Sequence, residues 1–95
     1  MVTMKQTPLR EVARVQVGAR MEKTLVKVLK ALAEYLDLSL GDLLEGVTLH
    51  ALEGKSAFSP QTLAHIKKLR TIYGLNLSAR DSHRLTEKDA KRARR

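Results

Sequence analysis

The sequence lacks the residues that usually cross-link small proteins or stack on nucleic-acid bases. It contains no Cys and no Trp. Without Cys, disulfides and thiolate metal sites are excluded, and a reducing compartment is compatible with the chain. The three aromatic residues, Tyr35, Phe58 and Tyr73, are too few and too scattered to form a stacking platform. Their scarcity argues against binding single-stranded nucleic acid or RNA by stacking.

The chain also lacks the patterns of membrane anchors, metal sites and catalytic sites. No run approaches the roughly 18 apolar residues of a membrane span, and "MVTMKQTPLR" has no apolar region typical of a signal peptide. His50, His65 and His83 do not have the spacing of metal ligands on one helix. There is no Gly-rich phosphate loop and no acid–base pair suited to catalysis. We therefore expect a cytoplasmic protein that is not an enzyme and uses no metal or cofactor.

Acidic residues are scarce, and the basic charge is unevenly distributed. Eighteen Lys and Arg face ten Asp and Glu, which gives a net charge of +8 and a pI near 10.2. Residues 22–54 are acidic, with three Lys against six acids, whereas residues 1–21, 55–77 and 78–95 are all basic. Such a balance predicts a polyanionic partner that binds outside the central segment.

The stretch "RVQVGARM", residues 14–21, alternates between apolar and polar side chains. This period of two predicts a β-strand. One face would carry Val15, Val17, Ala19 and Met21. The other face would carry Arg14, Gln16, Gly18 and Arg20.

The rest of the chain predicts helices. Apolar residues recur at helical spacing after Glu22 and predict a helix that ends near Asp37. Ser39 is a good N-cap for a second helix, which ends at Gly54. Ser59 and the following proline begin a third helix, which Gly74 ends. Residues 78–95 contain a single Leu and no other large apolar side chain, so we expect them to be disordered.

The predicted strand needs a partner, because its backbone N–H and C=O groups would otherwise stay unpaired. No second strand of similar quality occurs in the chain, and residues 14–54 are too few to form a stable core alone. Two copies of the strand could pair antiparallel across a two-fold axis. The sequence thus predicts a homodimer.

This order of elements resembles the ribbon-helix-helix family of DNA-binding proteins, the Arc/MetJ/CopG type. The resemblance covers about residues 12–54 and rests on "RVQVGARM", on "LVKVLKALAEYLDLSLGDLLEGV" and on the "ALAEYLDLS" turn. The matching turn residues are Ala31, Leu32, Ala33, Leu38 and Ser39. Asp37 stands where the family usually has Gly, and Gly41 and Asp42 replace its small-polar and Glu pair.

The resemblance implies a mainly α fold with one short strand per chain. Two chains would form an intertwined homodimer with a two-stranded antiparallel ribbon between the subunits. Residues 1–11 would be a flexible arm, and residues 12–54 the dimerisation and DNA-binding domain. Residues 55–77 would add a C-terminal helix, followed by the basic tail at 78–95.

In this family the ribbon enters the major groove of DNA, where its outward side chains reach base edges. The resemblance therefore assigns base contacts to Arg14, Gln16, Gly18 and Arg20, with Arg14 at the edge or on phosphate. Arg can bind guanine O6 and N7, and Gln can bind adenine N6 and N7. Gly18 would let the two backbones approach closely. The alternative is a solvated strand face with no ligand.

Two further regions are candidates for phosphate contacts. The N–H groups of Leu40 and Gly41, with the Ser39 hydroxyl, could hold a phosphate at a helix N-terminus. The Asp42 carboxylate occupies the same positive end and counts against this role. On the third predicted helix, Lys67, Lys68 and Arg70 either touch flanking phosphate or are simply solvated.

The function that follows is sequence-specific binding of double-stranded DNA by a homodimeric transcriptional regulator, such as a nucleoid-associated repressor. One alternative is an antitoxin-type regulator whose residues 55–95 bind a protein partner. The other is a small helical interaction module whose basic tail binds nucleic acid or acidic surfaces without specificity. No membrane partner is expected.

Overall fold

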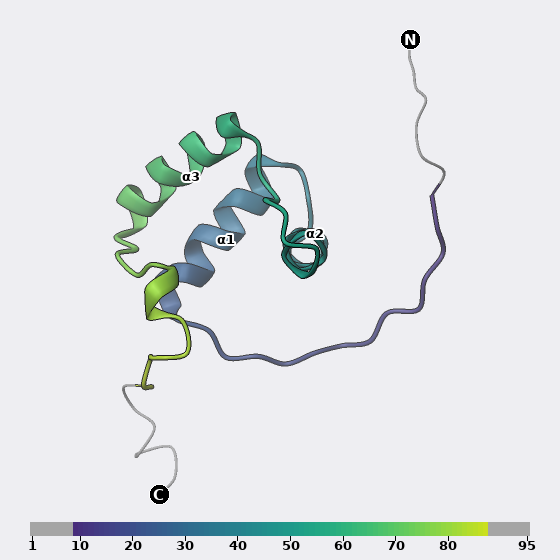
Figure 1. Ribbon diagram of the computed structural model, residues 1–95, viewed down its shortest axis with the longest axis horizontal. Helices are drawn as coiled ribbons and strands as arrows, with labels where there is room; N and C mark the ends of the chain where they lie inside the picture. The colour runs from purple at the N-terminus through teal and green to yellow at the C-terminus, as the bar shows by residue number, and fades with distance from the viewer. Residues whose placement is uncertain (1–8, 88–95) are drawn as a thin grey trace, which may run out of the picture.

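The computed structural model describes residues 9–87 and consists of three α-helices and one short 3-10 helix (Figure 1). Helix α1 spans Lys23–Tyr35, α2 spans Leu40–Leu52 and α3 spans Pro60–Tyr73. The 3-10 helix η1 spans Ala79–Asp81. All three helices predicted from the sequence are therefore confirmed.

Side-chain caps fix where each helix begins. The Ser39 hydroxyl accepts a hydrogen bond from the backbone N–H of Asp42 at 3.0 Å, and α2 starts at the next residue. The Ser59 hydroxyl accepts the N–H of Thr62 at 3.1 Å in the same way and begins α3. Both caps satisfy an N–H group that has no partner inside the helix.

Helix α1 begins with a cap that the sequence pattern did not single out. The Glu22 carboxylate accepts the backbone N–H of Leu25 at 2.8 Å and the Thr24 hydroxyl at 2.7 Å. These bonds, led by the one from the Thr24 hydroxyl, lower the pKa of Glu22 below its ordinary value of 4.5. The carboxylate therefore stays ionised, and continues to cap α1, at a lower pH than a free Glu would allow.

Each helix ends in a residue with left-handed backbone geometry. After α1, Asp37 has φ 59°, and the N–H of Leu38 donates to the Ala33 carbonyl at 2.9 Å. Gly54 after α2 and Gly74 after α3 have φ 70° and 71°. These are the closures that carbonyl groups at a helix C-terminus need. The expected end of α1 near Asp37 is confirmed, although the position holds a residue with a Cβ.

The mismatch at Asp37 leads to a prediction about stability. Replacing Asp37 with Gly should stabilise the protein by about 0.5–1 kcal/mol, because Gly adopts positive φ without steric cost. Gly74→Ala is the matched opposite change and should destabilise by roughly 1 kcal/mol. A Cβ at Gly74 would meet no heavy atom within 4 Å, so only the backbone conformation is tested there. Thermal unfolding measures both, and a lower melting temperature for Asp37→Gly would contradict this reasoning.

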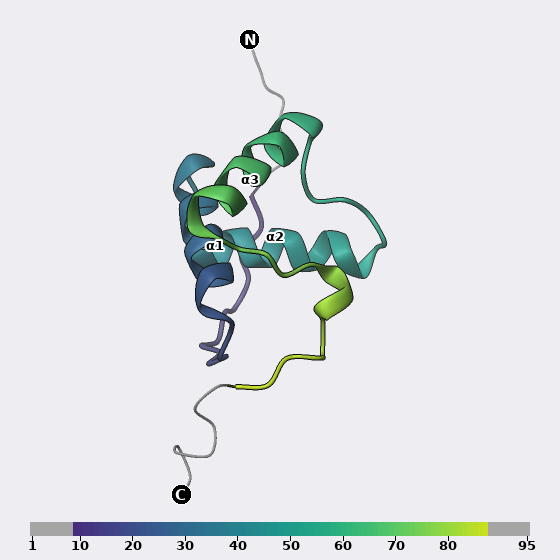
Figure 2. The same ribbon diagram turned by 90° about the vertical axis from the view of Figure 1, so that its left-hand side faces the viewer.

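The core lies where α1 packs against the other two helices. In Figure 1, α1 and α3 run side by side, while α2 is seen end-on; Figure 2 shows α2 along its length. Six apolar side chains are buried: Val28, Leu32, Ala33, Leu43, Leu69 and Leu75. Half of them come from α1, which confirms its predicted apolar stripe. The rings of Tyr35 and His65, stacked 3.7 Å apart, also join α1 to α3.

The predicted strand is wrong for this structure. Residues 9–21 form neither helix nor strand, and no strand occurs anywhere in residues 9–87. In the described residues the backbone of 9–21 makes no hydrogen bond, and Figure 1 shows this segment running out from the start of α1 around the outside of α2. The physical reason is that alternation favours a strand only when a second strand accepts its hydrogen bonds, and one chain supplies none.

The ribbon-helix-helix architecture expected from the resemblance is corrected at the same point. The order of an extended segment and two helices is present, but the β-ribbon that defines that architecture is absent from the described residues. The protein is a three-helix structure with an exposed N-terminal segment. Here the name "arm" is used for residues 9–21.

Some sequence expectations concern the two ends of the chain. Residues 1–8 of the expected flexible N-terminus and 88–95 of the expected disordered tail lie outside the described residues. Within the described part of that tail, η1 is held by the backbone N–H of Ser78, which donates to the Asp81 carboxylate at 2.8 Å. Among residues 9–87, no helix has both the length and the apolar character needed to cross a membrane.

Candidate nucleic-acid interface

The arm places all four predicted base-contacting residues in solvent. Arg14, Gln16, Gly18 and Arg20 are all exposed. A Cβ at Gly18 would meet no heavy atom within 4 Å, so the backbone there is open to close approach. No hydrogen bond or ion pair in the described residues joins these four to one another. The arm therefore offers donors and acceptors to a partner without a preformed pocket.

Arg14 attaches the arm to α2. Its Nε donates to Glu45 Oε2 at 2.9 Å, and its Nη2 donates to Glu45 Oε1 at 2.8 Å. Nη2 also lies 3.4 Å from Asp42 Oδ1. This is a two-point guanidinium–carboxylate pair, the strongest geometry for such ions. The two chain segments that meet are 31 residues apart in sequence.

Arg20 makes a similar pair with the C-terminal part of the described chain. Its Nε donates to Glu87 Oε1 at 2.9 Å, and its Nη2 contacts Glu87 Oε2. The Arg20 side chain is 82% exposed, so this pair lies in water. The two arginines of the arm are thus held by two different acidic residues, one on α2 and one beyond η1.

Both pairs change the titration of their acids in the expected direction. The hydrogen bond from Arg14, together with its charge, lowers the pKa of Glu45 below the ordinary 4.5. Arg20 lowers the pKa of Glu87 in the same way. A lowered pKa means that each pair is complete at neutral pH and is lost only as the pH falls through the lowered value.

The N-terminus of α2 is less open to phosphate than the sequence suggested. The Ser39 hydroxyl already accepts the N–H of Asp42. The N–H groups of Leu40 and Gly41 make no hydrogen bond to the described residues, so they remain available to an acceptor. The Asp42 carboxylate in this first turn repels an incoming anion.

The three basic residues of α3 separate into two environments. Lys67 and Lys68 are exposed and form no ion pair with the described residues. Arg70 is partly buried and donates from Nη2 to the Leu77 carbonyl at 2.7 Å. Arg70 thus fastens the chain that follows α3, while the two lysines keep their charge free for a polyanion.

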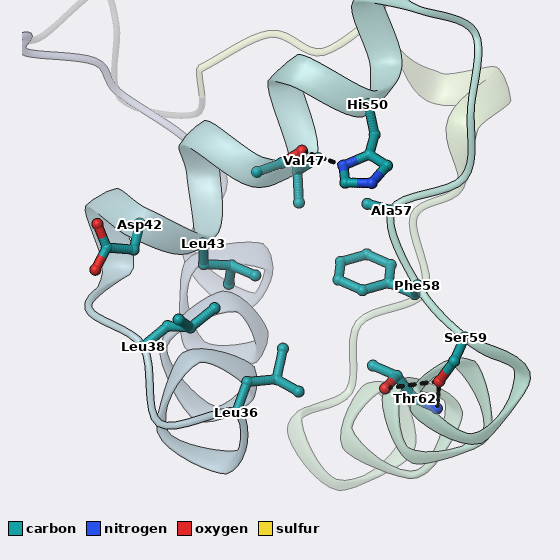
Figure 3. Close-up of a pocket in the computed structure, with 11 residues that line it drawn as sticks. Leu36, Leu38, Asp42, Leu43, Val47, His50, Ala57, Phe58, Ser59 and Thr62 are labelled. Carbon is teal, nitrogen blue, oxygen red and sulfur yellow. Dashed lines mark hydrogen bonds between the residues drawn. The ribbon is translucent and has the colours of Figure 1, made fainter. Parts of the chain in front are cut away.

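An apolar groove lies between α2 and the start of α3 (Figure 3). Its volume is about 380 Å³. The Phe58 ring faces Val47 and Leu43, and the Asp42 carboxylate points away from the ring. His50 Nδ1 lies 2.7 Å from the Gly46 carbonyl, so that ring atom is already engaged. No charged side chain points into the groove, and it shows no catalytic arrangement.

Metal binding has no counterpart in the part of the chain that the structure describes. There, no three His, Asp or Glu residues lie close enough together to hold an ion. The three histidines occupy separate places: His50 bonds its own helix, His65 stacks on Tyr35, and His83 follows η1.

Sequence reasoning missed the acidic partners of the arm. Asp42 was noted only as a helix-cap residue, and Glu45 and Glu87 were not singled out. The only sequence signal was the opposite charge of residues 1–21 and 22–54, which predicts attraction between these segments but not which residues meet. Contacts over such separations depend on how the helices pack.

A scan against protein-family models finds no match, and searches of curated proteins and of solved structures find no significant match either.

Proposed function

We propose that the protein binds double-stranded DNA in a sequence-specific manner and acts as a homodimeric transcriptional regulator. The observation that carries the proposal is the exposed arm. It presents two Arg side chains and one Gln at alternate positions, beside a Gly that leaves the backbone open. Arg and Gln are the side chains that bind guanine and adenine in a two-point manner in the major groove.

The charge distribution supports a polyanionic ligand. The chain carries +8 in total, and the exposed Lys67 and Lys68 are not neutralised by the described residues. Phosphate contacts from such residues would supply affinity without sequence preference, whereas the arm would supply specificity. The scarcity of aromatic side chains disfavours recognition of unstacked bases.

Homodimerisation is supported by apolar side chains that one chain leaves in water. Leu49 and Leu52 of α2 are 65% and 79% exposed, and Val15 and Val17 of the arm are 83% and 78% exposed. Glu45, which binds the arm through Arg14, lies one turn before Leu49 on the same face of α2. The four apolar residues therefore form one region, and a second copy could cover it.

The dimer leads to a prediction about Leu52. Sedimentation equilibrium should show a dimer for the wild-type chain at micromolar concentration and a monomer for Leu52→Glu. The change removes about 1.5–3 kcal/mol of apolar burial per subunit and adds a charge to the interface. Gln61→Glu adds the same charge on the exposed start of α3 and should leave the dimer intact. A wild-type chain that sediments as a monomer would refute the dimer.

The binding itself is tested by titrating the full-length protein into labelled duplexes and following fluorescence anisotropy. We expect a duplex of the preferred sequence to bind at least ten-fold more tightly than random duplex, and single strands to bind more weakly than either. Equal affinity for all duplexes would leave only non-specific binding through the basic residues.

A further inference from the structure

We infer that Glu45 is a built-in competitor for DNA, which occupies the recognition edge of Arg14 until a duplex displaces it. This inference rests on the proposed DNA binding and adds a mechanism that sets its strength. The Nε and Nη2 atoms of Arg14 lie 2.9 and 2.8 Å from the two oxygens of Glu45. The same pair of donors forms the two-point contact that guanine or a phosphate would accept.

The pair is built so that it can open. Side-chain exposure is 62% for Arg14 and 48% for Glu45, and ion pairs in water are weak. The arm makes no backbone hydrogen bond to the described residues, so it can leave α2 without breaking secondary structure. A phosphate-rich groove could therefore take Arg14 from Glu45, and the cost would reduce the net affinity.

Arg20 and Glu87 form a second, independent case of the same arrangement. The acid again binds Nε, at 2.9 Å, and comes from a different part of the chain. Both arginines of the arm thus start from a carboxylate, whereas no carboxylate of the described residues binds Gln16. Gln16 is the arm's one predicted polar reader that needs no release.

Competition by a carboxylate has a distinctive effect on salt dependence. Each Arg that neutralises a phosphate releases about 0.9 counterions from B-DNA. When Arg14 leaves Glu45, the freed carboxylate takes up a cation from solution and offsets part of that release. Removing the carboxylate should therefore steepen the dependence of affinity on salt, which a merely structural role would not do.

The test compares the full-length wild-type protein with E45Q and with E34Q at several KCl concentrations. Glu34 is exposed on α1 and forms no ion pair with the described residues, so E34Q changes the net charge equally without freeing an arginine. We expect E45Q to bind the preferred duplex about three- to ten-fold more tightly. Its log–log salt slope should steepen by up to about 0.9, and E34Q should change the affinity less than two-fold.

A double-variant comparison assigns the effect to Arg14. In an Arg14→Ala background, E45Q should bind no more tightly than Arg14→Ala alone, because no arginine remains to be released. E87Q repeats the experiment at Arg20 and should give a change of the same sign.

The outcomes are distinguishable. Equal gains for E45Q and E34Q would mean that only net charge matters, and would overturn the inference. Weaker binding by E45Q would overturn it in the other direction, since Glu45 would then position Arg14 for DNA. If the wild-type protein binds no duplex at all, the proposed function itself fails, and the inference fails with it.

Discussion

Replacing Leu32 with Ala should lower the free energy of unfolding by about 2–5 kcal/mol, the largest single effect that we expect in this chain. Leu32 is 2% exposed and comes from the helix that contacts both others. With only six buried side chains in the core, the neighbouring residues can fill little of the cavity that the change would leave.

The matched control for this change is Leu63→Ala, which removes the same atoms from a side chain that is 49% exposed on α3. It should cost less than about 1 kcal/mol, because surface substitutions rarely cost more. Urea unfolding of both variants, followed by circular dichroism, measures the difference. Equal losses would show that the core does not lie where α1 meets α2 and α3.

The second large effect concerns the arm. Gln16→Ala and Arg20→Ala should leave the melting temperature nearly unchanged, because both side chains lie in solvent. Each should weaken binding to the preferred duplex by about 1–3 kcal/mol and weaken binding to random duplex much less. Combined, the two changes should remove most of the preference for one sequence.

Two controls separate base recognition from loss of charge or amide. Lys27→Ala removes one positive charge from an exposed position on α1, and Gln61→Ala removes an exposed Gln from α3. Neither should change the ratio between preferred and random duplex. If Arg20→Ala weakens both duplexes equally, Arg20 is a phosphate contact, and specificity must come from other residues.

The helices could be predicted from the sequence because their determinants are local. Ser39 and Ser59 cap α2 and α3 as expected, and Gly74 ends α3 in the left-handed conformation that Gly adopts freely. The apolar stripe of α1 likewise predicted the largest share of the core, including Val28 and Leu32. Each of these signals depends on residues a few positions apart, so no knowledge of packing was needed.

The arm could not be predicted in the same way. Alternation of Val15 and Val17 with polar residues describes a chain that would fit into a sheet, but it does not supply the second strand. Hydrogen bonds between strands are the stabilising term, and no described residue of this chain provides them to the arm. The pattern therefore records exposed apolar side chains at regular spacing, without the secondary structure that it usually accompanies.

The candidate site was only partly predictable for a related reason. The sequence identified Arg14 and Arg20 as possible readers, and the structure places both in solvent. It gave no indication that Glu45 and Glu87 would hold them, since the partners are 31 and 67 residues away. Arg70 shows the reverse case: its charge suggested a phosphate contact, yet it bonds the Leu77 carbonyl.

Selection of bound sequences from a pool of random duplex DNA tests the proposed function most directly. The full-length wild-type protein should enrich one sequence that contains guanine and adenine in its central positions, as Arg and Gln recognition requires. The Gln16→Ala/Arg20→Ala variant, carried through the same selection, should lose that enrichment while remaining folded. If the wild-type protein enriches no sequence, or if the variant enriches the same one, the arm does not read DNA bases.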